Sequence, residues 1–301
     1  MRIFSFPNLS QAYTTHRYRA DERGTVIKVI GLGEAGSAVV DDVQAAGAGM
    51  IDEFVHVRAR ALEPNATRFT AFDSLREAAQ GAHLVILVAR PELGFEVESK
   101  RRMIAELLSP ERLVIEILLP GQREVLPTVP AANEDAAAQP ARAPARHCTI
   151  TLPAPTQEYP STHSMAESAG LAIRCIRTLT DLLDSCMIGI DFDDLKSALM
   201  DARVCRFAWG RHNGEQKGRM ATTSALAELL LDASFSANAV TGLAVLIEGE
   251  RQSLKMREYK VVMETLSPAF QSDTRVACNM VFREDMPADT LEVNVIVALA
   301  E

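Results

Sequence analysis

Short apolar runs that alternate with helical segments are the feature that most constrains how this chain can fold. The runs of the first half lie at residues 25–30, 54–57, 83–89 and 113–119. Nearly continuous apolar runs of this length are typical of strands buried on both faces of a parallel sheet. Segments with helical spacing separate them and begin near Gly36, Ser74 and Lys100. This order predicts an α/β fold, in which helices cover both faces of a doubly wound parallel sheet.

The second half of the chain has a different pattern. Residues 164–184 begin with a capping box, Ser164 and Glu167, and then keep apolar residues at helical spacing, which predicts one long central helix. Two helical and three strand-like segments follow, at residues 191–199, 221–231, 242–247, 275–282 and 291–298. Residues 211–214 are interpreted as a polar turn. The mixture predicts a smaller α+β domain at the C-terminal end.

We therefore expect four parts along the chain. Residues 1–24 are polar and irregular, which predicts a flexible arm. Residues 25–163 form the parallel-sheet domain, and within it residues 128–147 are rich in Ala, Pro and Arg and predict a disordered loop. The central helix takes residues 164–186, and the α+β domain takes residues 187–301.

The composition argues against several classes of protein. The formal net charge is -9, whereas a protein that binds nucleic acid usually presents a basic surface. No stretch has the roughly 18 consecutive apolar residues that span a bilayer, and the first residues lack the apolar core of a signal peptide. We therefore expect a cytoplasmic protein with no nucleic-acid partner and no direct membrane insertion.

The cysteines and histidines do not predict a metal site. The 5 cysteines are scattered and form no C-x-x-C pair, which suits small core residues in a reducing compartment. His56, His83 and His163 have no spacing that is typical of a metal site or a catalytic pair.

A glycine-rich loop follows the first predicted strand and directly precedes a helix. Its candidate ligand-binding residues are Gly31, Gly33, Glu34, Ala35, Gly36 and Ser37. Glycines let backbone N–H groups approach a phosphate, and the N-terminus of the helix adds partial positive charge. The loop fits a nucleotide site and equally a tight turn between a strand and a helix. Arg58 and Arg60 follow the second strand, where they would suit the 2′-phosphate of a dinucleotide or lie in a solvated loop.

From residue 25 onward the chain resembles FtsZ, the bacterial tubulin, in five segments that occur in the same order. The segments are 27–39 (IKVIGLGEAGSAV), 75–88 (LREAAQGAHLVILV), 164–184, 188–195 (IGIDFDDL), and the close formed by 240–247 and 290–300. The resemblance implies the fold of the FtsZ/tubulin superfamily: a GTPase-type domain, a long central helix and a smaller C-terminal domain. It also implies GTP or GDP as the cofactor and head-to-tail contact between subunits.

The chain departs from the family where the family binds phosphate. The family's signature is G-G-G-T-G-T-G, and this chain has R-P-E-L-G-F-E-V-E-S at residues 90–99. Pro91 donates no N–H, and three carboxylates, those of Glu92, Glu96 and Glu98, repel a triphosphate. The matching part of the central helix also lacks the Phe and the Asp that would hold guanine. The resemblance therefore implies a degraded GTP site in which only residues 31–37 remain as a phosphate cradle.

Asp191 and Asp194 have two interpretations. In the family, acidic residues of this loop position the water that attacks the GTP of the neighbouring subunit, so the resemblance implies a catalytic role for both. Alternatively, Asp191 is the N-cap of a helix and Asp194 favours its dipole. Gly189 stands where the family has Asn.

The resemblance implies a divergent cytoskeletal protein, either a filament subunit, a filament cap or a regulator of a related GTPase. Its partner would be a second copy or another FtsZ-like subunit. No counterpart of the family's C-terminal tail, which binds membrane-tethering division partners, follows the last strand, so we expect a role other than that of the main division-ring protein. The alternatives are an unusual GTPase that still binds GTP and a dinucleotide-dependent oxidoreductase.

Overall fold

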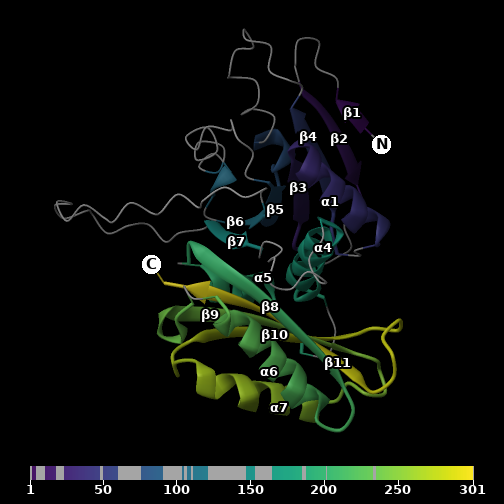
Figure 1. The fold of residues 1–301 in the computed structure, drawn as a ribbon. Helices are drawn as coiled ribbons and strands as arrows, with labels where there is room; N and C mark the ends of the chain where they lie inside the picture. Colours follow the sequence, from purple (N-terminus) through teal and green to yellow (C-terminus); the bar gives the residue numbers. More distant parts are fainter. Residues whose placement is uncertain are drawn as a thin grey trace, which may run out of the picture.

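The chain has an α/β architecture in which one eleven-stranded sheet passes through both halves of the molecule (Figure 1). The computed structural model describes residues 2–4, 11–17, 24–47, 50–59, 76–90, 104, 107–109, 111–120, 147–152, 165–184, 188–200, 202–232 and 235–300. Of the predicted loop at residues 128–147, residues 128–146 lie outside the described residues, as does the segment 91–99, whereas His147 is part of a strand.

Five parallel strands form the first half. They are β3 (Ile27–Leu32), β4 (Glu53–Ala59), β5 (Leu84–Ala89), β6 (Leu113–Leu118) and β7 (His147–Thr151), in the spatial order β4-β3-β5-β6-β7. All six residues of β5 are buried, because the strand lies in the middle of the sheet and has side chains packed on both faces. The prediction of a parallel sheet made from the apolar runs is confirmed.

Helices cover both faces of this sheet. On one face lie α1 (Gly33–Ala45) and α4 (Met165–Asp181), which is the predicted central helix. The opposite face is covered by helical residues at 76–78 and at 104 and 107, where Leu107 packs into a cluster with strand residues. The doubly wound arrangement that the sequence predicted is present.

The N-terminal residues differ from the expected flexible arm. Two strands, β1 (Arg2–Phe4) and β2 (Gln11–Arg17), form an antiparallel pair, and β2 also pairs antiparallel with β4. Without them, β4 would be an edge strand with unpaired backbone groups, and strand addition satisfies those groups. The β2 sequence includes Tyr13, Thr14 and Thr15, residue types that favour strands.

The C-terminal half is a second layered unit. Its elements are α5 (Phe192–Leu199), β8 (Val204–Asn213), α6 (Lys217–Leu230), β9 (Val240–Gly249), α7 (Met256–Leu266), β10 (Arg275–Phe282) and β11 (Thr290–Leu299), with 3₁₀ turns at Ala237–Ala239 and Ser267–Ala269. The strand order is β8-β11-β9-β10, and β8 also pairs with β7, which makes the sheet continuous. The predicted α+β domain is therefore present.

The central helix contributes to a core that both halves share. Ile176 and Leu179 of α4 pack in one cluster with Leu195 of α5 and with Leu246 and Ile296 of the C-terminal strands. The outer face of the C-terminal sheet has a separate core beneath α6 and α7. Because one hydrophobic cluster joins the two halves, we expect them to unfold together.

In the C-terminal half, two elements were not predicted from the sequence. The polar turn expected at residues 211–214 is largely the end of β8, which runs to Asn213 and pairs along its length with β11. Gly210 in this strand lies under α6, where a Cβ atom would be 2.0 Å from the carbonyl oxygen of Ala221. Helix α7 was also missed, because its sequence MREYKVVMETL contains only a narrow apolar stripe.

Candidate functional site

The glycine loop joins β3 to α1, as the sequence predicted. Two of its glycines serve packing. A Cβ atom on Gly36 would lie 2.2 Å from the carbonyl oxygen of Val88, and one on Gly31 would lie 2.6 Å from the carbonyl oxygen of Gly36. Helix α1 therefore approaches β3 and β5 at a distance that only glycine allows. For Gly31 and Gly36 the geometry supports the interpretation as a tight strand-to-helix turn.

The N-terminus of α1 retains features of a phosphate site. Gly33 has φ 71°, a left-handed conformation that glycine adopts without strain. Its N-cap, Leu32, provides no side-chain cap, so the first N–H groups of the helix receive no hydrogen bond from that side chain. The exposed Glu34 in the first turn supplies the opposite charge, which stabilises the helix dipole but opposes an anion.

Two buried polar atoms near this loop lack a hydrogen-bond partner among the described residues. They are the Oγ of Ser37, a residue that is 1% exposed, and the Nε of Arg90, which follows the last residue of β5. Buried polar atoms without partners are rare in folded proteins. The Ser37 hydroxyl and the Arg90 guanidinium are donor groups of the kind that bind phosphate oxygens.

Asp191 and Asp194 form a complete capping box at the start of α5. The Asp191 carboxylate accepts the Asp194 backbone N–H at 2.9 Å, and the Asp194 carboxylate accepts the Asp191 backbone N–H at 3.2 Å. Both residues are exposed. The capping role expected for Asp191 is confirmed, and it explains the two residues without any catalysis.

The glycine loop and Asp191 lie at opposite edges of the parallel sheet. Phe192, the first residue of α5, has its ring 6.0 Å from that of His83, immediately before the start of β5. The glycine loop instead contacts Val88, near the end of the same strand. A strand of six residues spans about 20 Å, so the two candidate sites do not meet within one chain.

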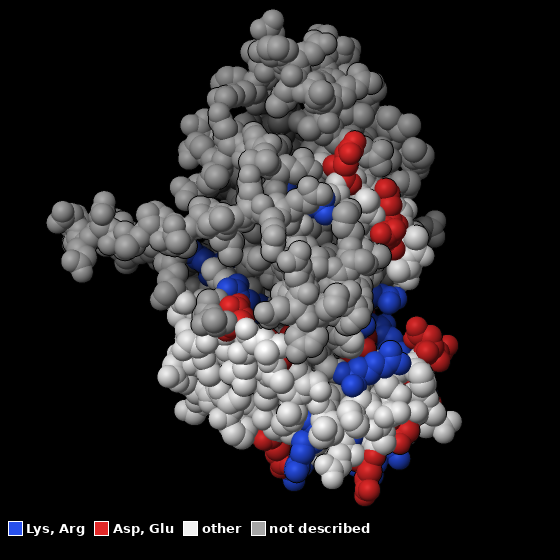
Figure 2. All heavy atoms as spheres, viewed as in Figure 1, with Lys and Arg blue, Asp and Glu red and all other residues white. Residues whose placement is uncertain are grey.

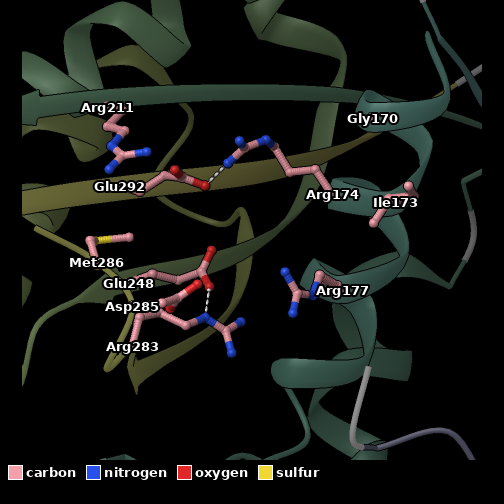
Figure 3. Close-up of a pocket in the computed structure, with 10 residues that line it drawn as sticks. All are labelled: Gly170, Ile173, Arg174, Arg177, Arg211, Glu248, Arg283, Asp285, Met286 and Glu292. Carbon is pink, nitrogen blue, oxygen red and sulfur yellow. Dashed lines mark hydrogen bonds and ion pairs between the residues drawn. The ribbon is translucent and has the colours of Figure 1, made fainter. Parts of the chain in front are cut away.

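A polar cavity between α4 and the C-terminal sheet was not predicted from the sequence. It has a volume of about 220 Å³ and is lined by Gly170, Ile173, Arg174, Arg177, Arg211, Glu248, Arg283, Asp285, Met286 and Glu292 (Figure 3). One signal was available: Glu248, Glu292 and Asn294 interrupt otherwise apolar strands. Buried polar side chains are retained only when they are paired, so they indicate partners elsewhere.

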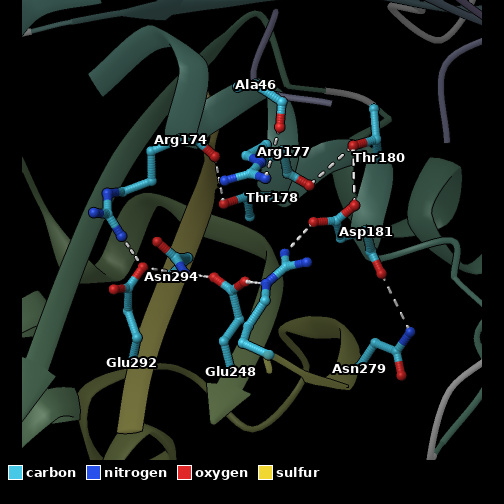
Figure 4. Close-up of polar contacts among 11 residues, drawn as sticks. Ala46, Arg174, Arg177, Thr178, Thr180, Asp181, Glu248, Asn279, Glu292 and Asn294 are labelled. Atoms are coloured by element: carbon cyan, nitrogen blue, oxygen red, sulfur yellow. Dashed lines mark hydrogen bonds and ion pairs between the residues drawn. The ribbon is translucent and has the colours of Figure 1, made fainter. Parts of the chain in front are cut away.

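Ion pairs around this cavity tie α4 to the C-terminal strands (Figure 4). Arg174 of α4 pairs with Glu292, and Arg283 pairs with both Asp181 of α4 and Glu248. Burial raises the pKa of the Glu248 carboxyl, although Arg283 opposes that shift. Burial lowers the pKa of Arg283, but the charges of Glu248 and Asp181 outweigh it and hold that pKa above its ordinary value.

The described cysteines are core residues. Four of them, Cys148, Cys175, Cys205 and Cys278, are buried and unpaired in any disulfide. Burial raises the pKa of Cys278 to about 12, so its thiol is protonated and unreactive at neutral pH. No group of His, Cys, Asp and Glu side chains within the described residues has the geometry of a metal site.

The described surface carries charges of both signs. On the face drawn in Figure 2, acidic and basic side chains lie interspersed over the C-terminal half. None of the helices that the structure describes is long and apolar enough to cross a membrane.

The fold is similar to solved structures of cytoskeletal proteins, whereas no family model and no curated protein matches the sequence. An empty FtsZ dimer from M. jannaschii has a TM-score of 0.66 at 14% identity, covering 91% of this chain and 88% of that one. CetZ2 from Haloferax volcanii, a GTPγS-bound protofilament, has a TM-score of 0.59 at 12% identity, covering 92% and 94%. TubZ from Bacillus thuringiensis serovar israelensis, in GDP-form protofilaments, has a TM-score of 0.55 at 10% identity, covering 93% and 86%.

These likenesses extend over both halves of the chain and over nearly the whole of each matched protein. They agree with the order of segments found in the sequence, including the central helix and the closing strands. A dinucleotide-binding oxidoreductase would share the first half alone. The chain has the fold of the FtsZ/tubulin superfamily.

Proposed function

We propose that this protein is a cytoskeletal assembly protein that makes head-to-tail contacts with a second copy or with another FtsZ-like subunit. The observation that carries the proposal is the placement of the glycine loop and of Asp191 at opposite edges of the parallel sheet. Two half-sites at opposite edges of the sheet do not meet within one chain, but they can meet between chains that stack in the same direction. Such a contact is heterologous, and heterologous contacts build open filaments.

We further propose that the edge that carries the glycine loop binds nucleotide poorly. The segment that replaces the family's phosphate signature contains Pro91, Glu92, Glu96 and Glu98. In addition, Gly31 and Gly36 are occupied in packing α1 onto the sheet. We expect weak or undetectable GTP binding and no appreciable hydrolysis by the isolated protein. Isothermal titration with GTP, GDP and NADPH measures this.

A chain with one competent end would act as a filament cap. It would dock its Asp191-bearing end onto the GTP-loaded end of an FtsZ-like subunit and stop further addition there. The experiment adds purified protein in substoichiometric amounts to a co-occurring FtsZ and follows polymer mass and phosphate release. Shorter polymers support capping of that partner, and unchanged assembly with unchanged GTP turnover rejects it.

Two substitutions of Asp191 distinguish its role as the N-cap of α5 from a catalytic role. Asp191→Asn keeps a side-chain oxygen that accepts the Asp194 N–H but removes the negative charge, whereas Asp191→Ala removes both. If Asp191 positions the water at the partner's GTP, both variants lose the stimulation of phosphate release. If it serves only to cap α5, Asp191→Asn behaves as the parent protein.

A second candidate function is that of an unusual GTPase. The orphaned Oγ of Ser37 and the uncapped N-terminus of α1 favour it, because both offer hydrogen-bond donors to a phosphate. Micromolar GTP affinity that is abolished by Gly33→Asp would establish this candidate and overturn the degraded site. Binding of NADPH in place of GTP would instead support the oxidoreductase.

A further inference from the structure

The cavity between α4 and the C-terminal sheet contains four arginines from three parts of the fold. Arg174 and Arg177 lie on α4, Arg211 on β8, and Arg283 just after β10. Figure 3 shows the four guanidinium groups directed toward the space between the helix and the strands. The cavity volume of about 220 Å³ lies a little below the roughly 300–1,000 Å³ of typical small-molecule pockets. It therefore has room for a small molecule.

Two of the arginines are committed to the protein. Arg174 pairs with Glu292 and lies over the Trp209 ring at 4.0 Å from its centroid. Arg283 pairs with Asp181 and Glu248. The Asn294 amide donates to Glu248 at 2.7 Å and to Glu292 at 3.3 Å, which satisfies further carboxylate oxygens. These contacts fix the walls of the cavity and neutralise the carboxylates of Glu248 and Glu292.

The other two arginines have unused donors. The Arg177 side chain makes one hydrogen bond, at 3.4 Å to the carbonyl oxygen of Ala46. The Arg211 side chain is exposed and forms no hydrogen bond or ion pair with the residues that the structure describes. Burial lowers the pKa of Arg174, the charge of Glu248 opposes that shift, and the nearby charges of Arg211 and Arg177 add to it. Asp285 is the opposing carboxylate, and it is exposed at the rim.

We propose that this cavity binds a small oxyanion, held between the guanidinium groups of Arg177 and Arg211. A guanidinium presents paired N–H donors that match the oxygens of phosphate and carboxylate groups, and charge-assisted bonds of this kind are among the strongest hydrogen bonds in proteins. The ligand carries at least two charged oxygens, one for each arginine. Inorganic phosphate, pyrophosphate and a small polycarboxylate share this chemistry.

Binding would connect the two halves of the molecule. Arg177 belongs to α4, whose apolar residues share a core cluster with the parallel sheet, and Arg211 belongs to β8 of the C-terminal sheet. An anion between them adds a bridge that exists only in the folded arrangement. A ligand that binds only the folded state raises its stability by an amount that grows with the logarithm of ligand concentration.

The test measures thermal unfolding and isothermal titration of the full chain with phosphate, pyrophosphate, citrate and GTP at constant ionic strength. We expect a saturable rise in Tm with at least one of the three small anions, and the anion that acts identifies the ligand class. Arg177→Gln and Arg211→Gln should each weaken binding by about tenfold or more. Asp285→Asn should strengthen binding, because it removes the opposing charge at the rim.

The matched control is Arg219→Gln on α6, which removes an exposed arginine outside the cavity. It should leave the affinity unchanged, and circular dichroism should show that all four variants are folded. The proposal is overturned if no small anion gives a saturable shift, or if GTP alone binds. It is equally overturned if Arg219→Gln weakens binding as much as the two cavity variants do, since that result indicates general screening.

Discussion

Single glycines show how differently one residue type is used in this molecule. A Cβ atom added to Gly36 in α1 would lie 2.2 Å from the carbonyl oxygen of Val88. A Cβ atom added to Gly170 in α4 would have no neighbouring atom within 4 Å. Both are helical glycines, and the sequence alone does not distinguish them. The difference is the neighbouring strand, which approaches α1 closely and leaves that side of α4 open.

The first prediction compares these two glycines. Gly36→Ala should lower the free energy of unfolding by about 2 kcal/mol or more, because the methyl group meets backbone atoms that cannot move aside. Gly170→Ala should raise it by roughly 0.5–1 kcal/mol, since alanine is the better helix former. Urea denaturation measures both changes. Equal effects in the two variants would contradict the close packing of α1.

At the scale of elements, α4 and α5 position candidate functional residues. Helix α4 is long enough to pack against both halves, and α5 begins with a complete capping box next to the residue that precedes β5. Their start signals were visible in the sequence as Ser164 with Glu167 and as Asp191 with Asp194. Local hydrogen bonding determines such signals, so they were predictable.

The second prediction concerns the buried face of α4. Ile176 is fully buried in the cluster that joins the two halves. Ile176→Asp should destabilise the protein by about 3–5 kcal/mol, because it places an unpaired carboxylate in that cluster. Ile176→Val should cost only about 1 kcal/mol. Thermal unfolding followed by circular dichroism tests the pair, and a small loss in the aspartate variant would contradict the burial.

The third prediction concerns the start of α5. Asp191→Ala should lower stability by about 1 kcal/mol, because the Asp194 N–H loses its acceptor. Asp191→Asn should be close to neutral, since asparagine is an equally good N-cap. Chemical denaturation distinguishes them. A loss of similar size in both variants would show that the charge, and not the cap, is the stabilising feature.

At the scale of the whole molecule, polar contacts between α4 and the C-terminal strands define how the two halves meet. Asn279 of β10 donates to the carbonyl oxygens of Leu182 and Asp184 at 3.0 and 2.8 Å, which caps the end of α4. Arg283 holds the carboxylates of Asp181 and Glu248 together. Asn279 and Arg283 are 95 to 102 positions from their partners in and after α4, so only the fold brings them into contact.

The fourth prediction removes the central cation of this network. Arg283→Met should destabilise the protein by about 3–5 kcal/mol, because it leaves two buried carboxylates without their partner. The control is Lys260→Met, which breaks an exposed pair with Glu264 and should cost about 0.5 kcal/mol or less. Guanidinium denaturation compares the variants. If the two losses were equal, the network would be no more than a surface feature.

The fifth prediction concerns the dependence of stability on pH. Burial raises the pKa of Glu248 above 4.5, so between 4.5 and the folded-state pKa the folded protein binds a proton that the unfolded chain does not. In that window the contribution of Glu248 to stability increases as the pH falls. The stability difference between the parent protein and Glu248→Gln should therefore shift in favour of the parent protein on acidification. A shift in the opposite direction would contradict the raised pKa.

The sequence by itself determined the elements and their order. Apolar runs predicted the buried strands, capping residues predicted where α4 and α5 begin, and the ordered segments implied the FtsZ/tubulin fold. These features depend on neighbours close in sequence or on side-chain periodicity, which a single sequence displays directly. In the C-terminal half, β8 and α7 were missed because their apolar patterns are mixed, and long-range packing is what stabilises them.

Only the tertiary structure decided the roles of the loop glycines and of the charged residues. It assigned Gly31 and Gly36 to close packing, because the approach of Val88 to α1 is a contact between separate elements. It placed Asp191 and the glycine loop at opposite edges of the sheet, and it gathered Arg174, Arg177, Arg211 and Arg283 around one cavity. Charges on separate elements acquire a role only from their distances to one another, and those distances arise when the core packs.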